Sequence, residues 1–437
     1  MKKTVCIILA LAQVLLLCGC DIFTADTAEL LSPPPLTGDI YPIAEAIKES
    51  AAGAYTLKYP SRGNHRSAVV QYDINSDGVL EAFALYSMTD GEVMTMHINA
   101  VCFKDGEWRS VAQQKIIAGG VDRVDFCDLD GDGAAEILVG WEIYGTSQMQ
   151  LAVYSLGENS LTQRMLQRYN HFITCDLDED DRNEVMIIRT ASAEQQNTAS
   201  LYILTDDGVA ELSNCSLDST VKTVNEPQLS TLSSGKPAVY IDEIKGVGAV
   251  TEVLFIEKGV LVNPLLSKET GETISTLRSV LFSIKDINND GIIEIPVQVN
   301  VPSVSKSEVN EKLYFTNWCS FNGETLTNQM TTMINTNDSY YYIIPQKWIG
   351  RVAVLKDTAR NLRELYRYNP EDMTAGERLM YIKAVDKQEW DSGKHRALNA
   401  EEIVNDSKTT YVCYLSEAAI ADGIDIEKVK ADFKLYE

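Results

Sequence analysis

The chain has 437 residues, of which 63 are Asp or Glu and 38 are Lys or Arg, so its formal net charge at pH 7 is −25. Binding to nucleic acid or to anionic lipid surfaces depends on Lys and Arg, so this charge argues against both kinds of partner. The chain is also long enough to bury a hydrophobic core without the help of disulfides.

The N-terminus has the features of a secretory signal. Met1-Lys2-Lys3 precedes an apolar run from Val5 to Cys18, which is shorter than the about 20 residues of a membrane-spanning helix. The run ends in Leu17-Cys18-Gly19-Cys20, which resembles the lipobox of bacterial lipoproteins. The resemblance implies that residues 1–19 are a signal peptide, that Cys20 carries the lipid, and that the protein is an extracytoplasmic, membrane-anchored lipoprotein. An ordinary secreted protein is the alternative.

A short tether and a few local elements follow the signal. Residues 20–40 include Ser32-Pro33-Pro34-Pro35-Leu36, which favours a stiff polyproline segment. A short helix is expected over residues 43–48, and strands are expected over residues 55–59 and 68–72.

A nine-residue acidic loop then occurs four times. Its clearest copy runs from Asp128 to Glu136 as Asp-Leu-Asp-Gly-Asp-Gly-Ala-Ala-Glu, and the others begin at Asp73, Asp176 and Asp286. All four fit the pattern Asp-x-Asp/Asn-x-Asp-Gly/Asp-x-x-Glu. Their starts are 55, 48 and 110 residues apart, so we expect one further repeat, with a degenerate loop, between the last two.

The loops carry the hard oxygen ligands that calcium prefers: carboxylate or amide oxygens at positions 1, 3, 5 and 9, and a backbone carbonyl at position 7. Without a cation these carboxylates would repel one another. The predicted ligands of the four loops are Asp73, Asn75, Asp77, Val79 and Glu81; Asp128, Asp130, Asp132, Ala134 and Glu136; Asp176, Asp178, Asp180, Arg182 and Glu184; and Asp286, Asn288, Asp290, Ile292 and Glu294.

Position 6 is where such a loop must reverse, and glycine there accepts a positive φ. The third loop has Asp181 at this position, whereas the other three have glycine. An EF-hand shares the first half of the pattern but places its bidentate glutamate at position 12, between two helices. Position 12 is apolar in all four loops, and residues 136–141 and 184–188 have the composition of strands, so the EF-hand interpretation is excluded.

A period of about 50 residues built from short strands is typical of propeller blades. Together with the acidic loops, it resembles the FG-GAP/VCBS repeats of integrin-α-like β-propellers. The resemblance implies a mainly β protein, with a propeller of about 5–7 blades over residues 41–345 and about three or four bound calcium ions. In the degenerate repeat, the loop near residues 234–240 lacks an acidic cluster, so we predict no metal there.

Two cysteines, Cys127 and Cys175, each directly precede the first Asp of a loop. We predict small apolar residues that close equivalent strands, with a disulfide as the alternative. Cysteine-zinc chemistry is disfavoured because no paired cysteine spacing occurs.

The pattern changes after residue 345. Strands are expected over residues 348–354, 379–385 and 410–415, and a helix over residues 425–433. Residues 346–437 are therefore predicted to form a small α+β domain, with a final irregular blade as the alternative.

No catalytic motif accompanies the four histidines, and the paired carboxylates of the loops are better explained as metal ligands. We therefore predict a binding or adaptor module, not an enzyme, whose partner is an envelope protein or a glycan. A hydrolase or lyase of cell-surface polysaccharide that uses the propeller as a scaffold is the alternative. A structural or assembly lipoprotein is a third possibility.

Overall fold

The computed structural model describes residues 40–90, 93–146, 148–190, 196–205, 208–279, 282–302, 313–357 and 362–436. The predicted signal peptide, Cys20 and the tether up to residue 39 lie outside this part of the chain. Among the residues described, no helix is long and apolar enough to cross a membrane.

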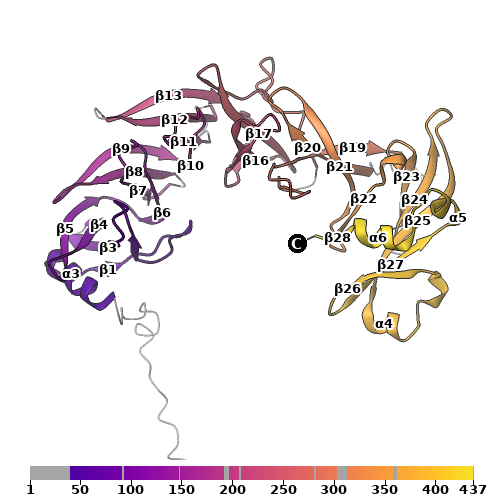
Figure 1. Cartoon of the computed structure of the whole chain (residues 1–437), viewed down its shortest axis with the longest axis horizontal. Helices are drawn as coiled ribbons and strands as arrows, with labels where there is room; N and C mark the ends of the chain where they lie inside the picture. Colours follow the sequence, from indigo (N-terminus) through magenta and orange to yellow (C-terminus); the bar gives the residue numbers. More distant parts are fainter. Residues whose placement is uncertain are drawn as a thin grey trace, which may run out of the picture. The chain divides into compact units, whose positions relative to one another are not determined.

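The protein is mainly β, as predicted, and its strands form consecutive antiparallel sheets (Figure 1). The first contains β1 (Thr56–Leu57), β2 (Val69–Tyr72), β3 (Glu81–Asp90), β4 (Val93–Lys104) and β5 (Glu107–Ile116). The second contains β6 (Gly120–Cys127), β7 (Glu136–Glu142), β8 (Met149–Leu156) and β9 (Leu161–Tyr169). The third contains β10 (His171–Cys175), β11 (Glu184–Arg189), β12 (Thr198–Thr205) and β13 (Gly208–Ser216).

Three further sheets complete the described chain. The fourth contains β14 (Thr223–Val224), β15 (Gln228–Thr231), β16 (Pro237–Lys245), β17 (Gly248–Glu257) and β18 (Val260–Val262). The fifth contains β19 (Ile295–Val301), β20 (Leu313–Phe321), β21 (Leu326–Asn335), β22 (Tyr340–Ile343) and β28 (Phe433–Leu435). The sixth contains β23 (Val352–Asp357), β24 (Leu362–Asn369), β25 (Thr374–Asp386), β26 (Glu401–Asn405) and β27 (Thr409–Leu415).

The fourth sheet is the repeat that the loop spacing predicts between the third and fourth acidic loops. A short turn joins β15 to β16, and the Leu232 amide donates to the Lys236 carbonyl across it (2.7 Å). Gly235 has a φ of 92°, which a residue with a Cβ would rarely adopt. A plain hairpin therefore joins these two strands.

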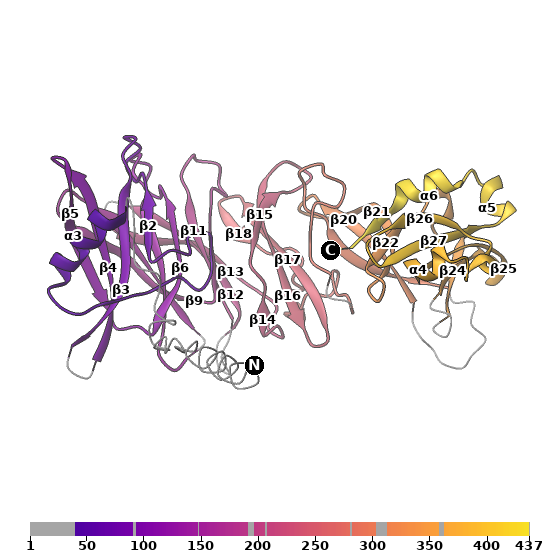
Figure 2. The same ribbon diagram turned by 90° about the horizontal axis from the view of Figure 1, so that it is seen from below.

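The chain divides into two compact units. The first contains the chain up to Val124 and the segment Leu156–Thr162, and the second contains Asp125–Ser155 and the chain from Gln163 onward. In the first unit, helix α3 (Tyr41–Ala51) packs its apolar face, including Ile43 and Ile47, against the first sheet (Figure 2). In the second unit, apolar side chains from consecutive sheets share cores. Leu201 of the third sheet and Val239 of the fourth belong to one such core.

The last part of the chain mixes strands and short helices, as predicted. Its helical segments are η2 (Gln346–Trp348), α4 (Lys387–Asp391), η3 (Arg396–Leu398), α5 (Glu417–Ala421) and α6 (Ile426–Asp432). The predicted domain boundary at residue 345 falls between Ile344 and Trp348, which are buried in the same core. After α6 the chain returns to the fifth sheet, where β28 pairs with β22 (Figure 1).

The aromatic side chain of Phe433 ties this returning strand to the core. Its ring lies 5.1 Å from that of Tyr340 and 5.2 Å from that of Tyr411, measured between centroids. We expect Phe433→Ala to lower the free energy of unfolding by roughly 3–5 kcal/mol, because it leaves a cavity between two sheets. Urea unfolding would measure the loss. Leu435→Ala on the same strand, where the side chain is largely exposed, should change it by less than about 0.5 kcal/mol.

Candidate metal centre

The four acidic loops share one backbone conformation. Each loop leads into a strand that begins at its glutamate or at the next residue. The backbone of each loop adopts a positive φ at two positions. At position 4 the φ angles are 56° (Ser76), 77° (Gly131), 62° (Glu179) and 61° (Asn289). At position 6 they are 86° (Gly78), 90° (Gly133), 66° (Asp181) and 87° (Gly291). The third loop therefore makes the same turn without glycine, because aspartate is among the residues that tolerate this region best.

Backbone amides hold the first and fifth side chains of each loop in place. The carboxylate at position 1 accepts a hydrogen bond from the amide at position 6 in every loop, for example 2.9 Å between Gly78 and Asp73. The carboxylate at position 5 accepts from the amide at position 7, for example 2.8 Å between Ala134 and Asp132. These bonds orient the carboxylates before any cation binds.

The glutamate at position 9 is buried in all four loops. The exposed fractions are 7% for Glu81, 3% for Glu136, 1% for Glu184 and 0% for Glu294. One carboxylate oxygen accepts a hydrogen bond from the amide at position 2, at 3.1, 2.9, 2.9 and 3.0 Å in loop order. Position 2 is a buried apolar residue in each loop: Ile74, Leu129, Leu177 and Ile287.

Burial and the neighbouring carboxylates perturb these glutamates. Burial is the main cause that raises the pKa of each one, and the nearby aspartates raise it further. The pKa rises to about 7 for Glu184 and to about 6 for Glu294. A buried carboxylate next to several others is stabilised by a cation, so the donor set fits a divalent ion that prefers oxygen.

The loops differ in how closely their acids gather. In the third loop, Asp176, Asp178, Asp180 and Glu184 each bring one oxygen to within 4.8 Å of the others. In the second loop, Asp128, Asp130 and Glu136 do the same, and Asp132 does not belong to this group. These acidic clusters could hold a metal ion.

The first and fourth loops carry asparagine at position 3. Asn75 Nδ2 donates to Asp77 (3.0 Å), and Asn288 Nδ2 donates to Asp290 (2.9 Å). The amide nitrogen of the asparagine thus replaces a carboxylate oxygen that would repel the aspartate at position 5. The remaining predicted ligands lie in the same loops, with Val79, Ala134, Arg182 and Ile292 at position 7.

Two features of the sites were not predicted from the sequence. Ser155 Oγ donates to the second oxygen of Glu136 (3.0 Å), and no pattern in the sequence links these residues. The apolar residue at position 2 does have a visible signal, because it is Ile or Leu in all four loops. Cys127 and Cys175 are free thiols, and burial raises the pKa of Cys127 to about 11.

Comparisons with known proteins do not identify a family. No family profile and no curated protein matches the chain. Among solved structures, rhamnogalacturonan lyase YesW has a TM-score of 0.31 at 12% identity, covering 72% of this chain and 66% of the lyase. The periplasmic gluconolactonase of Pseudomonas aeruginosa has a TM-score of 0.29 at 12% identity, covering 73% and 86%. This chain thus spans slightly less than two thirds of YesW. Similarities this distant assign neither an activity nor a ligand.

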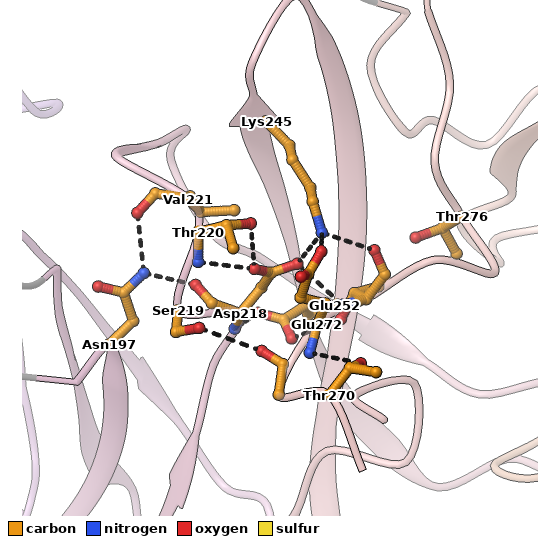
Figure 3. A network of polar contacts seen from close by, with 12 residues as sticks. Asn197, Asp218, Ser219, Thr220, Val221, Lys245, Glu252, Thr270, Glu272 and Thr276 are labelled. Atoms are coloured by element: carbon orange, nitrogen blue, oxygen red, sulfur yellow. Dashed lines mark hydrogen bonds and ion pairs between the residues drawn. The ribbon is translucent and has the colours of Figure 1, made fainter. Parts of the chain in front are cut away.

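At the fourth sheet, which lacks an acidic loop, Lys245 of β16 neutralises acids of the neighbouring loops (Figure 3). Lys245 Nζ lies 2.8 Å from Asp218 Oδ2 and 2.7 Å from Glu272 Oε2. Burial raises the pKa of Asp218, but hydrogen bonds from Lys245 and Thr220 lower it by more, so the net shift is downward. Deeper in the sheet, the buried Arg278 guanidinium pairs with Asp242 at 2.8 Å.

One buried acid of this network, Glu243, has no such partner among the described residues. Glu252 accepts hydrogen bonds from Asn263, Thr273 and the Asp218 amide. Glu243 is fully buried beside it, and within the described part of the chain no donor reaches either of its oxygens. Burial, followed by the charge of Glu252, raises the pKa of Glu243 well above its usual value. The pair is therefore satisfied when Glu243 is protonated and shares its proton with Glu252.

This arrangement predicts a pH-dependent stability. The pKa of Glu243 is higher in the folded state than the 4.5 of an exposed glutamate. Its contribution to the free energy of unfolding is therefore fully present below pH 4.5 and is lost as the pH rises toward the folded pKa. Glu243→Gln keeps a donor for Glu252 and cannot ionise. Relative to this variant, the wild type should lose about 1.4 kcal/mol per pH unit over that window.

Urea unfolding of both proteins between pH 5 and 9 would measure the difference. Taking the difference between the two proteins cancels the titration of the loop glutamates. Glu257→Gln, at an exposed end of β17, is the matched control and should follow the wild type at every pH. A wild type and a Glu243→Gln variant with parallel pH profiles would contradict the shared proton.

Proposed function

We propose that this chain is a calcium-binding repeat protein of a bacterial cell envelope. In this proposal Cys20 carries the lipid anchor, the sheets are blades of an FG-GAP/VCBS-like propeller, and the body is a binding or adaptor module. The observation that carries the proposal is the buried glutamate at position 9, repeated in four loops of one conformation, with a raised pKa and a carboxylate cluster beside it.

The ligand set favours calcium over magnesium. Each loop offers four side-chain positions and one carbonyl, all of them oxygen donors, within nine residues. Calcium accepts six to eight oxygens in flexible geometry, whereas magnesium demands a near-ideal octahedron and keeps several of its waters. The side chains of the loop bind the ion, and the amides described above keep those side chains oriented.

The bound ion has a structural role in this proposal. Each loop joins two strands of a sheet or leads into one, and its glutamate is buried at the base of those strands. An ion that neutralises this carboxylate removes the cost of burying it, so the ion stabilises the sheet. The polar rims of the sheets are then free to contact a protein or a glycan.

A cavity of about 710 Å³ in the second unit is a candidate contact surface for such a partner. Its lining is mainly apolar but includes the polar side chains of Lys245, Glu272, Gln298 and Tyr314. Burial lowers the pKa of Lys245, but its bonds to Asp218 and Glu272 raise it by more, so this lysine is charged at neutral pH. Lys245 is thus suited to binding, and a polysaccharide hydrolase or lyase would need another group as its base.

Calcium should stabilise the protein selectively. Extracellular calcium modules bind with dissociation constants of about 10⁻⁴–10⁻³ M, so each site should add roughly 0.5–1.5 kcal/mol at about 1 mM calcium. We expect calcium to raise the thermal midpoint of a chain that begins at residue 21, magnesium to raise it less, and chelator to lower it. Metal analysis should find about three or four ions per chain.

Asp132→Asn should reduce this calcium-dependent shift, because it removes one charged ligand. Asp105→Asn is the control. Asp105 lies in the exposed turn between β4 and β5, has a φ of 55° and does not belong to an acidic loop. Equal effects of the two substitutions, or a melt that chelator leaves unchanged, would refute the site assignment.

Binding and catalysis can be separated directly. Incubation of the calcium-loaded protein with cell-wall glycans and peptidoglycan fragments should give retention on the glycan or on a co-purifying envelope protein, without new reducing or unsaturated ends. Product formation above a heat-inactivated control would favour the hydrolase or lyase alternative.

A further inference from the structure

The third loop differs from the others at positions 7 and 8. It has Arg182 and Asn183 there, whereas the other loops have only small or apolar residues: Val79 and Leu80, Ala134 and Ala135, Ile292 and Ile293. Position 7 contributes a backbone carbonyl to the expected ion and position 8 contributes nothing, so the ligand pattern does not require polar side chains. Their contacts explain them.

Both side chains reach the second loop. Asn183 Nδ2 donates to the backbone carbonyl of Asp128, the first residue of that loop (3.3 Å). The Arg182 side chain lies across Gly131, so that a Cβ on Gly131 would be 3.2 Å from Arg182 Nε and 3.4 Å from its Cγ. Gly131 is the only glycine at position 4, where the other loops have Ser76, Glu179 and Asn289. The sequences of the two loops are therefore fitted to each other.

The strands beneath the loops also pack together. Leu129 of the second loop shares a buried core with Phe172 of β10 and Val185 of β11. Cys127, which precedes the second loop, packs against the same core. The contact between the loops thus rests on a packed base.

We propose that the second and third loops form a coupled pair of cation sites, in which Arg182 and Asn183 transmit the order of one loop to the other. This inference rests on the proposed calcium function. An ion in the third loop fixes the backbone at Arg182, whose carbonyl is its ligand. The same segment then holds Gly131 and the Asp128 carbonyl in place, so the second loop loses less freedom when it binds its own ion.

The coupling is reciprocal, because an ion in the second loop fixes the same contacts from the other side. Couplings between sites are typically at least about fivefold in affinity, so we expect Asp178→Asn in the third loop to weaken binding at the second by about fivefold or more. Asp290→Asn removes a ligand from the fourth loop, and no contact is described between that loop and the second. It should leave the second site unchanged.

The experiment is a calcium titration of the chain from residue 21 by calorimetry, with ions counted by metal analysis. The wild type, Asp130→Asn, Asp178→Asn, Asp290→Asn and the two double variants that contain Asp130→Asn form two cycles. The effects of Asp130→Asn and Asp178→Asn should be non-additive, and those of Asp130→Asn and Asp290→Asn additive.

A second variant tests the contact itself. Asn183→Ala removes one hydrogen bond between the loops and no ligand. The coupling can therefore still be measured with this variant if a ligand variant fails to fold. We expect it to lower the affinity of the second site, whereas Leu80→Ala, at the same position of the first loop, should not. If the wild type binds about three or four ions but both cycles are additive, the coupling is wrong and the calcium function stands. If the wild type binds no calcium, both are wrong.

Discussion

The burial of one glutamate at the end of each acidic loop is the constraint on which the rest of the site depends. The amide at position 2 donates to this carboxylate, and the side chain of the same residue is apolar and buried. A buried carboxylate costs free energy unless it is paired or protonated. In the proposed function a bound cation supplies this pairing, and the backbone bonds to positions 1 and 5 orient the other acids of the loop.

The protein meets this need in two ways. In the fourth sheet, Lys245 and Arg278 supply the charge from within the chain, so that Asp218 has a lowered pKa. In the acidic loops the pKa of Glu184 rises instead, because this carboxyl group is buried and lies beside several aspartates. The fourth sheet thus uses a cation of its own chain, whereas the acidic loops could hold an external one.

In the proposed function, calcium binding links folding to the surroundings. A chain that depends on external cations is more stable where calcium is plentiful, which agrees with the proposed location outside the cytoplasm. In this proposal the net negative charge disfavours nucleic acid and anionic lipid as partners, so the tether, not surface charge, would hold the protein at the membrane. The proposed recognition of a partner would then fall to surfaces such as the cavity beside Lys245.

The sequence alone determined the local features, because these depend on neighbouring residues. The spacing of acids and glycines predicted the loops, the periodicity predicted the strands around them, and the interval between loops predicted the sheet at β14–β18. Helix α6 followed from its apolar spacing.

Only the tertiary structure decided how distant residues meet. The pairing of β28 with β22 joins residues about 90 positions apart, and no local pattern specifies such a partner. The same holds for Ser155 on Glu136, for Glu243 beside Glu252, and for Asn183 on the second loop. In the sequence Arg182 and Asn183 look like departures from a consensus, and they acquire a physical reason only when the fold brings Gly131 and Asp128 beside them.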